Sequence, residues 1–135
     1  MRTMKPMNTL LLLYAAASLL HFIHNAEFLS AYPGLPASWS RWTIYFAWVA
    51  MTSIGVLGWI LLQRRYEWPG LLLLAGYAAL GMDSLGHYVV GSFTQHTLMM
   101  NAGILTEVIA ATLVMFEVLR RVARKVFAPL QSRAH

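Results

Sequence analysis

The 135-residue chain contains no cysteine and few charged residues. The missing thiols exclude disulfide bonds, thiolate catalysis, and zinc or iron–sulfur sites with cysteine ligands. Charged residues make up 11% of the sequence, against about 25% in soluble domains, whereas hydrophobic residues make up 59%. Because so few polar side chains cannot cover a water-facing globule, the composition predicts an integral membrane protein.

Acidic residues are scarcer than basic ones, 5 against 10, and the net charge is +5. Nucleic-acid-binding domains are also basic, but here the basic residues form short clusters between long apolar runs. That placement fits membrane orientation better than a basic binding face, so we expect no nucleic-acid partner. The expected partner is the lipid bilayer, and the sequence is compatible with a homo-oligomer or a larger membrane complex.

Four apolar segments are long enough to cross a membrane, which takes roughly 20 residues. Turn-forming or basic stretches separate them, and they cover about residues 8–29, 42–62, 70–91 and 97–119. Connections this short make neighbouring helices antiparallel. The sequence therefore predicts an all-α fold, in which residues 1–135 form one transmembrane domain, an up-down-up-down four-helix bundle.

The basic residues predict the orientation of this domain. Arg41 is expected on one side of the membrane, and the other nine on the opposite side: Arg2, Lys5, Arg64, Arg65, Arg120, Arg121, Arg124, Lys125 and Arg133. Because basic loops stay in the cytoplasm, we expect both termini and the basic tail 120–135 there. Residues 30–41 and 91–96 then face outward from the plasma (inner) membrane.

Residues 1–18 also resemble a secretory signal peptide, with a basic start, an apolar run and three alanines near a cleavage position. The apolar run, however, continues through Ile23. We therefore expect this segment to be retained as the first span.

Ionisable residues inside the predicted spans are the main functional signal. Each costs roughly 2.5–3.5 kcal/mol to insert, so such residues usually face a partner within the protein. His21, His24 and Glu27 are three residues apart and form one stripe, because each step turns only about 60° around a helix. Asp83 and His87 are four residues apart, which places them on one face of the third helix.

The ionisable residues also share a depth. At 1.5 Å per residue from the outer boundary, His21, Asp83 and Glu107 lie ~12–15 Å deep and the other polar residues ~3–8 Å deep. Apart from Glu117, the inner halves of the spans are nearly all apolar. We therefore predict a polar pocket in the outer half, formed by His24, Glu27, Asp83, His87 and Glu107, with His21 and Asn101 as hydrogen-bond partners.

Simpler interpretations exist for each of these residues. A single membrane histidine is more often a packing hydrogen-bond donor or acceptor than a ligand, and the whole group is alternatively a purely structural network. Glu27 and His96 lie close enough to the interface to face water. Glu117 is expected to pair with Arg120 and Arg121, three and four residues later, and is left out of the site.

Two short motifs resemble the HXXEE group of bacterial membrane proteins. They are His24-Asn25-Ala26-Glu27 in the first span and Asp83-Ser84-Leu85-Gly86-His87 in the third. That group pairs a His-x-x-Glu-Glu motif in an early helix with further histidines in later ones. Phe28 stands where the second glutamate is expected, and Asp83 where asparagine is expected. The resemblance implies a membrane site of histidine and carboxylate side chains.

Imidazole and carboxylate ligands together suit a divalent metal such as zinc, iron or manganese. We therefore expect His24, Glu27, Asp83, His87 and Glu107 to bind such an ion. A metal with an open position would allow action on a lipidic or small-molecule substrate. The His24-x-x-Glu27 pair lacks the second histidine of a His-Glu-x-x-His metalloprotease, so the sequence does not establish whether the protein is an enzyme.

Two other functions fit the same residues. His24 and His87, at similar depth on different helices, have the placement of axial ligands of a b-type haem. Buried acid–histidine chains also carry protons, which suggests a non-enzymatic binder, a proton relay or a transporter subunit.

Overall fold

A computed structural model describes residues 5–131, with side chains through residue 127. Within this range the regular structure is entirely helical, so the predicted all-α fold is confirmed. Arg2, Arg133 and the end of the predicted tail lie outside the described residues. The elements in chain order are α1 (Lys5–Glu27), η1 (Leu29–Ala31), α2 (Arg41–Gln63), α3 (Glu67–Met82), η2 (Asp83–Gly86), α4 (His87–Val90), η3 (Phe93–Gln95) and α5 (Leu98–Gln131).

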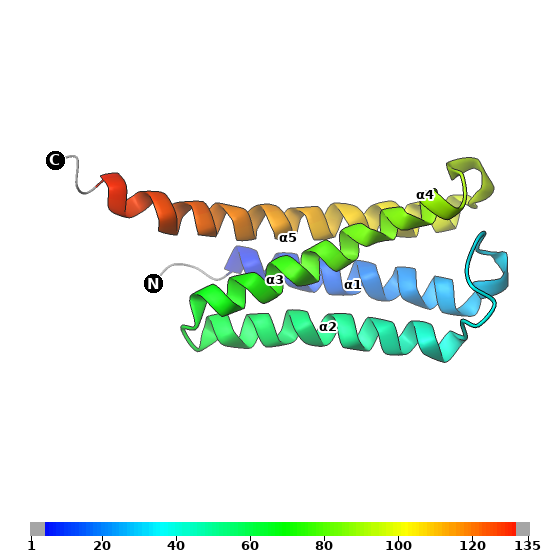
Figure 1. The fold of residues 1–135 in the computed structure, drawn as a ribbon, viewed down its shortest axis with the longest axis horizontal. Coiled ribbons are helices and arrows are strands. Elements are labelled where there is room, and N and C mark those ends of the chain that lie inside the picture. The colour runs from blue at the N-terminus through cyan, green and yellow to red at the C-terminus, as the bar shows by residue number, and fades with distance from the viewer. Residues whose placement is uncertain (1–4, 132–135) are drawn as a thin grey trace.

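The long helices α1, α2, α3 and α5 lie side by side, and each runs back along the one before it (Figure 1). Helix α1 packs against α2 and α5, and α3 also packs against α2 and α5, so the four form a closed ring. One end of the molecule holds the end of α1, the start of α2, and the segments η1, α4 and η3 (Figure 1). We call it the loop end.

Local sequence signals explain where the helices begin and end. Pro6 stands in the first turn of α1, where its missing N–H leaves no hydrogen bond unmade. Helix α2 begins after Ser40, whose side chain accepts a hydrogen bond from the backbone N–H of Thr43 at 3.2 Å. It ends in a tight turn in which Arg65 adopts a left-handed φ of 70°.

The third predicted span, residues 70–91, is interrupted in the structure. Helix α3 ends at Met82, a 3₁₀ turn follows over Asp83–Gly86, and the short helix α4 continues to Val90. The three pieces follow one direction across the molecule (Figure 1). A 3₁₀ helix turns 120° per residue instead of 100°, so residues four apart are offset by about 120° rather than about 40°. The turn therefore changes which residues of this segment share a face.

The last helix is longer than the sequence suggested. The predicted span ended near residue 119, whereas α5 continues without a break to Gln131. Ion pairs hold this extension. Glu117 binds Arg120 at 2.6 Å and Arg121 at 2.8 Å, as predicted for it, and Lys125 pairs with Glu67 at the start of α3.

The helix ring buries ionisable side chains in its interior and exposes apolar side chains on its outer surface. The core contains large apolar and aromatic side chains such as Tyr14, Leu74 and Tyr77, but it also buries the ionisable Glu107 (0% exposed) and His21 (2%). The outer surface is strongly apolar, with Leu72 74% exposed. Among the described residues, three helical segments, within α1, α2 and α5, are long and apolar enough to cross a membrane.

Candidate functional site

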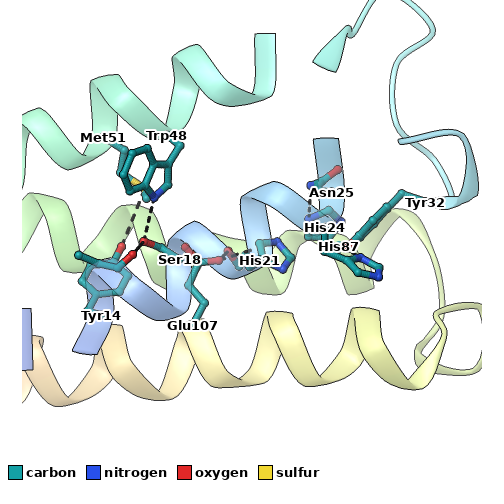
Figure 2. Close-up of polar contacts among 12 residues, drawn as sticks. Tyr14, Ser18, His21, His24, Asn25, Tyr32, Trp48, Met51, His87 and Glu107 are labelled. Atoms are coloured by element: carbon teal, nitrogen blue, oxygen red, sulfur yellow. Dashed lines mark hydrogen bonds and ion pairs between the residues drawn. The ribbon is translucent and has the colours of Figure 1, made fainter. Parts of the chain in front are cut away.

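Four of the five histidines of the chain gather at the loop end around Tyr32. The ring centres of His21, His24, His87 and His96 lie 6.4, 5.8, 5.3 and 6.4 Å from that of Tyr32. Figure 2 shows three of them approaching one another from α1 and α4, with Tyr32 alongside. We call these four side chains the histidine cluster.

Tyr32 reaches this position because the chain turns back immediately after α1. The 3₁₀ turn η1 directs Tyr32 over the end of the helix, where it is only 5% exposed. Its hydroxyl lies 2.9 Å from Nδ1 of His24 in hydrogen-bond geometry. Burial raises the pKa of the Tyr32 phenol to about 12, so this ring is a neutral donor and acceptor at physiological pH.

At the inner end of the cluster, His21 meets a buried acid from α5. Nε2 of His21 lies 3.8 Å from Oε2 of Glu107 (Figure 2). The hydroxyl of Ser84 donates to the same oxygen at 2.7 Å. The other carboxylate oxygen, Oε1, has no hydrogen-bond partner among the described residues. Gly103 permits this approach, because a Cβ there would stand 3.1 Å from Nδ1 of His21.

His87, from α4, connects the inner and outer parts of the cluster. Its ring centre lies 5.4 Å from that of His21 and 6.1 Å from that of His96. Nε2 of His87 lies 3.5 Å from the Asn25 amide nitrogen, and the Asn25 oxygen has no partner among the described residues. Turning the Asn25 amide by 180° lets its oxygen accept from Nε2–H, which leaves a lone pair on Nδ1 of His87.

His96 is held by the turn that precedes α5. Its Nδ1 donates to the backbone carbonyl of Ser92 at 2.9 Å, so Nε2 carries the lone pair. That nitrogen is buried and has no partner within the described residues. Asn101 fixes the turn by donating to the carbonyls of Phe93 (3.2 Å) and His96 (3.3 Å), and its own oxygen accepts from Tyr88 at 2.8 Å.

Two acids of the predicted pocket are exposed rather than buried within the cluster, although Asp83 lies close enough to His87 for their charges to interact. Glu27, at the end of α1, is exposed and binds α2 instead, accepting from Tyr45 at 2.7 Å and Arg41 at 3.3 Å. Asp83 is also exposed, whereas His87 is half-buried, because the 3₁₀ turn between them rotates the two off the shared face expected for a continuous α-helix.

The unpaired nitrogens give the cluster its binding potential. Nδ1 of His21, Nδ1 of His87 and Nε2 of His96 are all buried and without hydrogen-bond partners in residues 5–131. As the side chains stand, no three histidine, aspartate or glutamate residues of the described chain are arranged to hold a metal ion. The ring of Tyr32 packs against both His24 and His87, the two residues considered as haem ligands.

Sequence reasoning left two residues of this site aside. Tyr32 reads as an interfacial aromatic residue in a loop, and His96 as a residue near water, yet both are buried. Helical periodicity carries no information about such positions, because turns and not helix faces direct both side chains inward. The Pro33 and Gly34 pair after Tyr32 is the one local signal that the chain folds back there.

Comparisons of the chain with family models, curated proteins and solved structures found no match. The resemblance to the HXXEE group therefore stays a prediction from the two short motifs.

Proposed function

We propose that this chain is a four-span protein of the plasma (inner) membrane whose histidine cluster, in the outer half of an up-down-up-down bundle, binds a divalent metal ion. Both termini lie in the cytoplasm in this proposal, and the loop end faces outward. The observation that carries the metal proposal is the set of three buried, unpartnered imidazole nitrogens around Tyr32.

The distribution of polarity supports placement in a bilayer. Leu12, Phe46 and Leu72 are 72, 71 and 74% exposed, while Glu107 and His21 are almost completely buried. In water this arrangement would expose apolar surface and bury charge, and both are unfavourable. In hydrocarbon, the same arrangement keeps the ionisable groups in contact with each other and the apolar groups in contact with lipid.

The interrupted segment of α3, η2 and α4 is long enough to cross the membrane as well, in addition to the three segments within α1, α2 and α5. Helix α3 alone has 16 residues, which rise only about 24 Å. Adding the 3₁₀ turn and α4 extends the segment to about 38 Å, at 2.0 Å per 3₁₀ residue and 1.5 Å per α residue. Non-α backbone at membrane depth is tolerated where it lines a protein interior, and Ser84 in this turn contacts the buried Glu107.

Metal binding explains the unpaired nitrogens. Metal-binding histidines commonly donate their second ring N–H to a carbonyl group, as Nδ1 of His96 does to Ser92. Two imidazoles on one tetrahedral metal have ring centres about 5 Å apart, given metal–nitrogen distances of roughly 2.0–2.1 Å. The separations of 5.4 Å (His21–His87) and 6.1 Å (His87–His96) are within about 1 Å of that value. Bringing the three nitrogens to one ion requires the rings to rotate from their present positions, and Glu107, on the Nε2 side of His21, would hold that ring as its carboxylate partner.

The proposal is tested by metal content and stability of detergent-purified protein carrying a tag without histidine. We expect about one zinc, iron or manganese ion per chain, and a melting temperature that rises with added metal and falls with chelator. A ligand at 100 times its Kd stabilises the folded state by about 2.7 kcal/mol. His87→Ala and His96→Ala should each abolish this stabilisation.

Two variants serve as controls. Glu27→Gln changes an acid held by Arg41 and Tyr45, and His135→Ala removes a histidine from the far end of the sequence. Both should bind metal like the wild type. Wild-type protein that purifies without metal and whose melting is unchanged by all three ions and by chelator would refute the proposal. A Soret absorption band in the purified protein would instead identify haem as the ligand.

A proton relay is a second candidate, favoured by a row of neighbouring titratable groups. From Glu107, which accepts from Ser84, the row passes to His21, 3.8 Å away, and then to His87 and His96, whose ring centres follow at 5.4 and 6.1 Å. Metal-free protein that acidifies liposomes under a membrane potential, and loses this activity on Glu107→Gln, would favour the relay over the metal site.

A further inference from the structure

Cationic side chains gather at the end of the molecule opposite the loop end. Residues 64–67 and 117–125 contain six basic and two acidic residues. The turn between α2 and α3 provides two of the basic residues, and the second half of α5 provides the other four. We call these six residues the cationic cluster: Arg64, Arg65, Arg120, Arg121, Arg124 and Lys125.

An ion pair joins the two parts of the cationic cluster. Lys125 of α5 pairs with Glu67 in the first turn of α3. Glu67 follows Arg65 by two residues, so this contact holds the extension of α5 close to the turn that carries Arg64 and Arg65. In Figure 1, α5 continues past the ends of the other long helices at this end of the molecule. The two groups of basic residues therefore lie at a similar level along the long axis.

The acids at this end balance only part of the positive charge. Glu67 is paired with Lys125, and the buried Glu117 is paired with two arginines of its own helix. The cluster therefore has an excess of four positive charges over the two acids. Three of its arginines are exposed and form no ion pair with the described residues: Arg64, Arg65 and Arg124.

The backbone at Arg65 is one that favours glycine. Its φ is 70°, and no other non-glycine residue of the described chain has a positive φ. The N–H of Tyr66 donates to the carbonyl of Leu61 at 2.9 Å, and the N–H of Arg65 donates to that of Leu62 at 3.1 Å. These are the hydrogen bonds of a Schellman motif, in which glycine is the usual residue at the left-handed position. An arginine there gives up backbone stability, which a function of its charged side chain would offset.

The length of α5 places the cationic cluster beside lipid headgroups in the proposed topology. From Leu98 on the outer side, about 20 residues of the helix cross the hydrocarbon layer. Arg120 and Lys125 then lie roughly 3–11 Å beyond that layer, at 1.5 Å per residue, which is the depth of the headgroups. Tyr66 and Trp68, next to the arginine turn, are 61 and 55% exposed, as expected for aromatic residues at the interface.

We propose that the cationic cluster binds the headgroups of anionic phospholipids, with Arg64, Arg65 and Arg124 as the residues that contact the phosphate. Charge complementarity selects this partner. A zwitterionic lipid brings no net charge, whereas an anionic headgroup balances an unpaired arginine and accepts its hydrogen bonds. The inference rests on the proposed membrane insertion, but not on a metal at the histidine cluster.

The test uses protein in nanodiscs with equal amounts of phosphatidylcholine and phosphatidylglycerol. Native mass spectrometry counts the molecules of each lipid that stay bound to the released protein. We expect phosphatidylglycerol to exceed phosphatidylcholine about tenfold, since each arginine near an anionic surface strengthens binding about fivefold. Phosphatidylglycerol should also raise the melting temperature above that in pure phosphatidylcholine. Both leaflets have the same composition, so the result does not depend on the orientation of the protein in cells.

Variants separate the cationic cluster from ordinary surface charge. Arg64→Gln with Arg65→Gln should lower the ratio of the two bound lipids at least about fivefold. Arg65→Gly should also lower it, yet leave the melting temperature in phosphatidylcholine unchanged or higher, because glycine suits the left-handed backbone. Arg41→Gln is the matched control, since Arg41 lies at the loop end and is paired with Glu27. It should keep the wild-type ratio.

Three results would overturn the inference. Equal retention of the two lipids by the wild type would show that no anionic lipid is selected. A loss of preference in Arg41→Gln as large as in the double variant would show that any surface arginine has the same effect. If millimolar inorganic phosphate stabilises the protein in phosphatidylcholine as much as phosphatidylglycerol does, the cluster binds a free anion and not a lipid. Protein that does not enter nanodiscs at all would instead refute the proposed membrane insertion.

Discussion

The buried acid Glu107 has few neighbours that can stabilise it. Glu107 is completely buried, yet within the described chain it receives one hydrogen bond, from Ser84, and has His21 at 3.8 Å. A buried acid with so few partners depends strongly on each of them, because an unsatisfied polar group keeps its full desolvation cost. Single substitutions around Glu107 therefore report directly on the energetics of the site.

Ser84→Ala should destabilise the protein, because it removes the hydroxyl that donates to Glu107 at 2.7 Å. The expected loss is about 1–3 kcal/mol, measured by thermal or denaturant unfolding in detergent micelles. The matched control is Ser53→Ala, whose exposed hydroxyl bonds only the carbonyl of Val49 in its own helix. That variant should stay within about 0.5 kcal/mol of the wild type. Equal stability of the two variants would show that Glu107 does not depend on Ser84.

At the level of elements, the third span shows how a short irregular segment changes a site. Had residues 70–91 formed one α-helix, Asp83 and His87 would share a face. The 3₁₀ turn instead leaves Asp83 exposed, presents Ser84 to Glu107, and starts α4 with His87 near His21. This turn thus decides which third-span residues join the cluster.

The packing of α2 against α3 gives a prediction from two glycines. Gly55→Ala should cost about 1–3 kcal/mol, because the added Cβ meets the Tyr77 ring at 2.5 Å and that ring is packed on Tyr14, with centres 4.3 Å apart. Gly76→Ala is the control, since its Cβ would meet nothing within 4 Å. It should leave stability unchanged or raise it by up to about 1 kcal/mol through helix propensity. Melting temperatures in the reverse order would contradict this helix contact.

At the scale of the whole molecule, the basic residues are distributed unevenly along the long axis. Helix α2 begins with Arg41 at the loop end, and Arg64 and Arg65 directly follow its other end. Arg120 and Lys125 belong to the second half of α5, and the ends of α2 and α5 lie at the end of the molecule opposite the loop end (Figure 1). By the positive-inside rule, the end of the molecule with more basic residues faces the cytoplasm. The predicted orientation therefore directs the loop end, with the histidine cluster, toward the outer face of the membrane.

Single-cysteine labelling tests the orientation, because the natural chain has no cysteine of its own. Ser38→Cys and Gln63→Cys each place one thiol at an exposed position at opposite ends of α2. In intact cells, a membrane-impermeant maleimide should label Cys at position 38, and should label position 63 only after permeabilisation. The reverse pattern would place the histidine cluster in the cytoplasmic half and refute the proposed topology.

Much of the fold follows from the sequence by itself. Long apolar runs broken by basic or proline-containing segments are enough to predict an all-α chain and the approximate position of its helices. The pairing of Glu117 with Arg120 and Arg121 was likewise predictable. These features depend on residues close together in the chain, so helical spacing is sufficient to predict them.

Only the tertiary structure decided which polar residues meet. Glu27 and His24 share a stripe on α1, but Glu27 binds Arg41 and Tyr45 of α2, while His24 faces Tyr32. Tyr32 and His96 join the cluster because turns outside the long helices fold back over it. The physical reason is that contacts between distant segments depend on how turns close and helices rotate against each other, and neither is encoded in the periodicity of one helix.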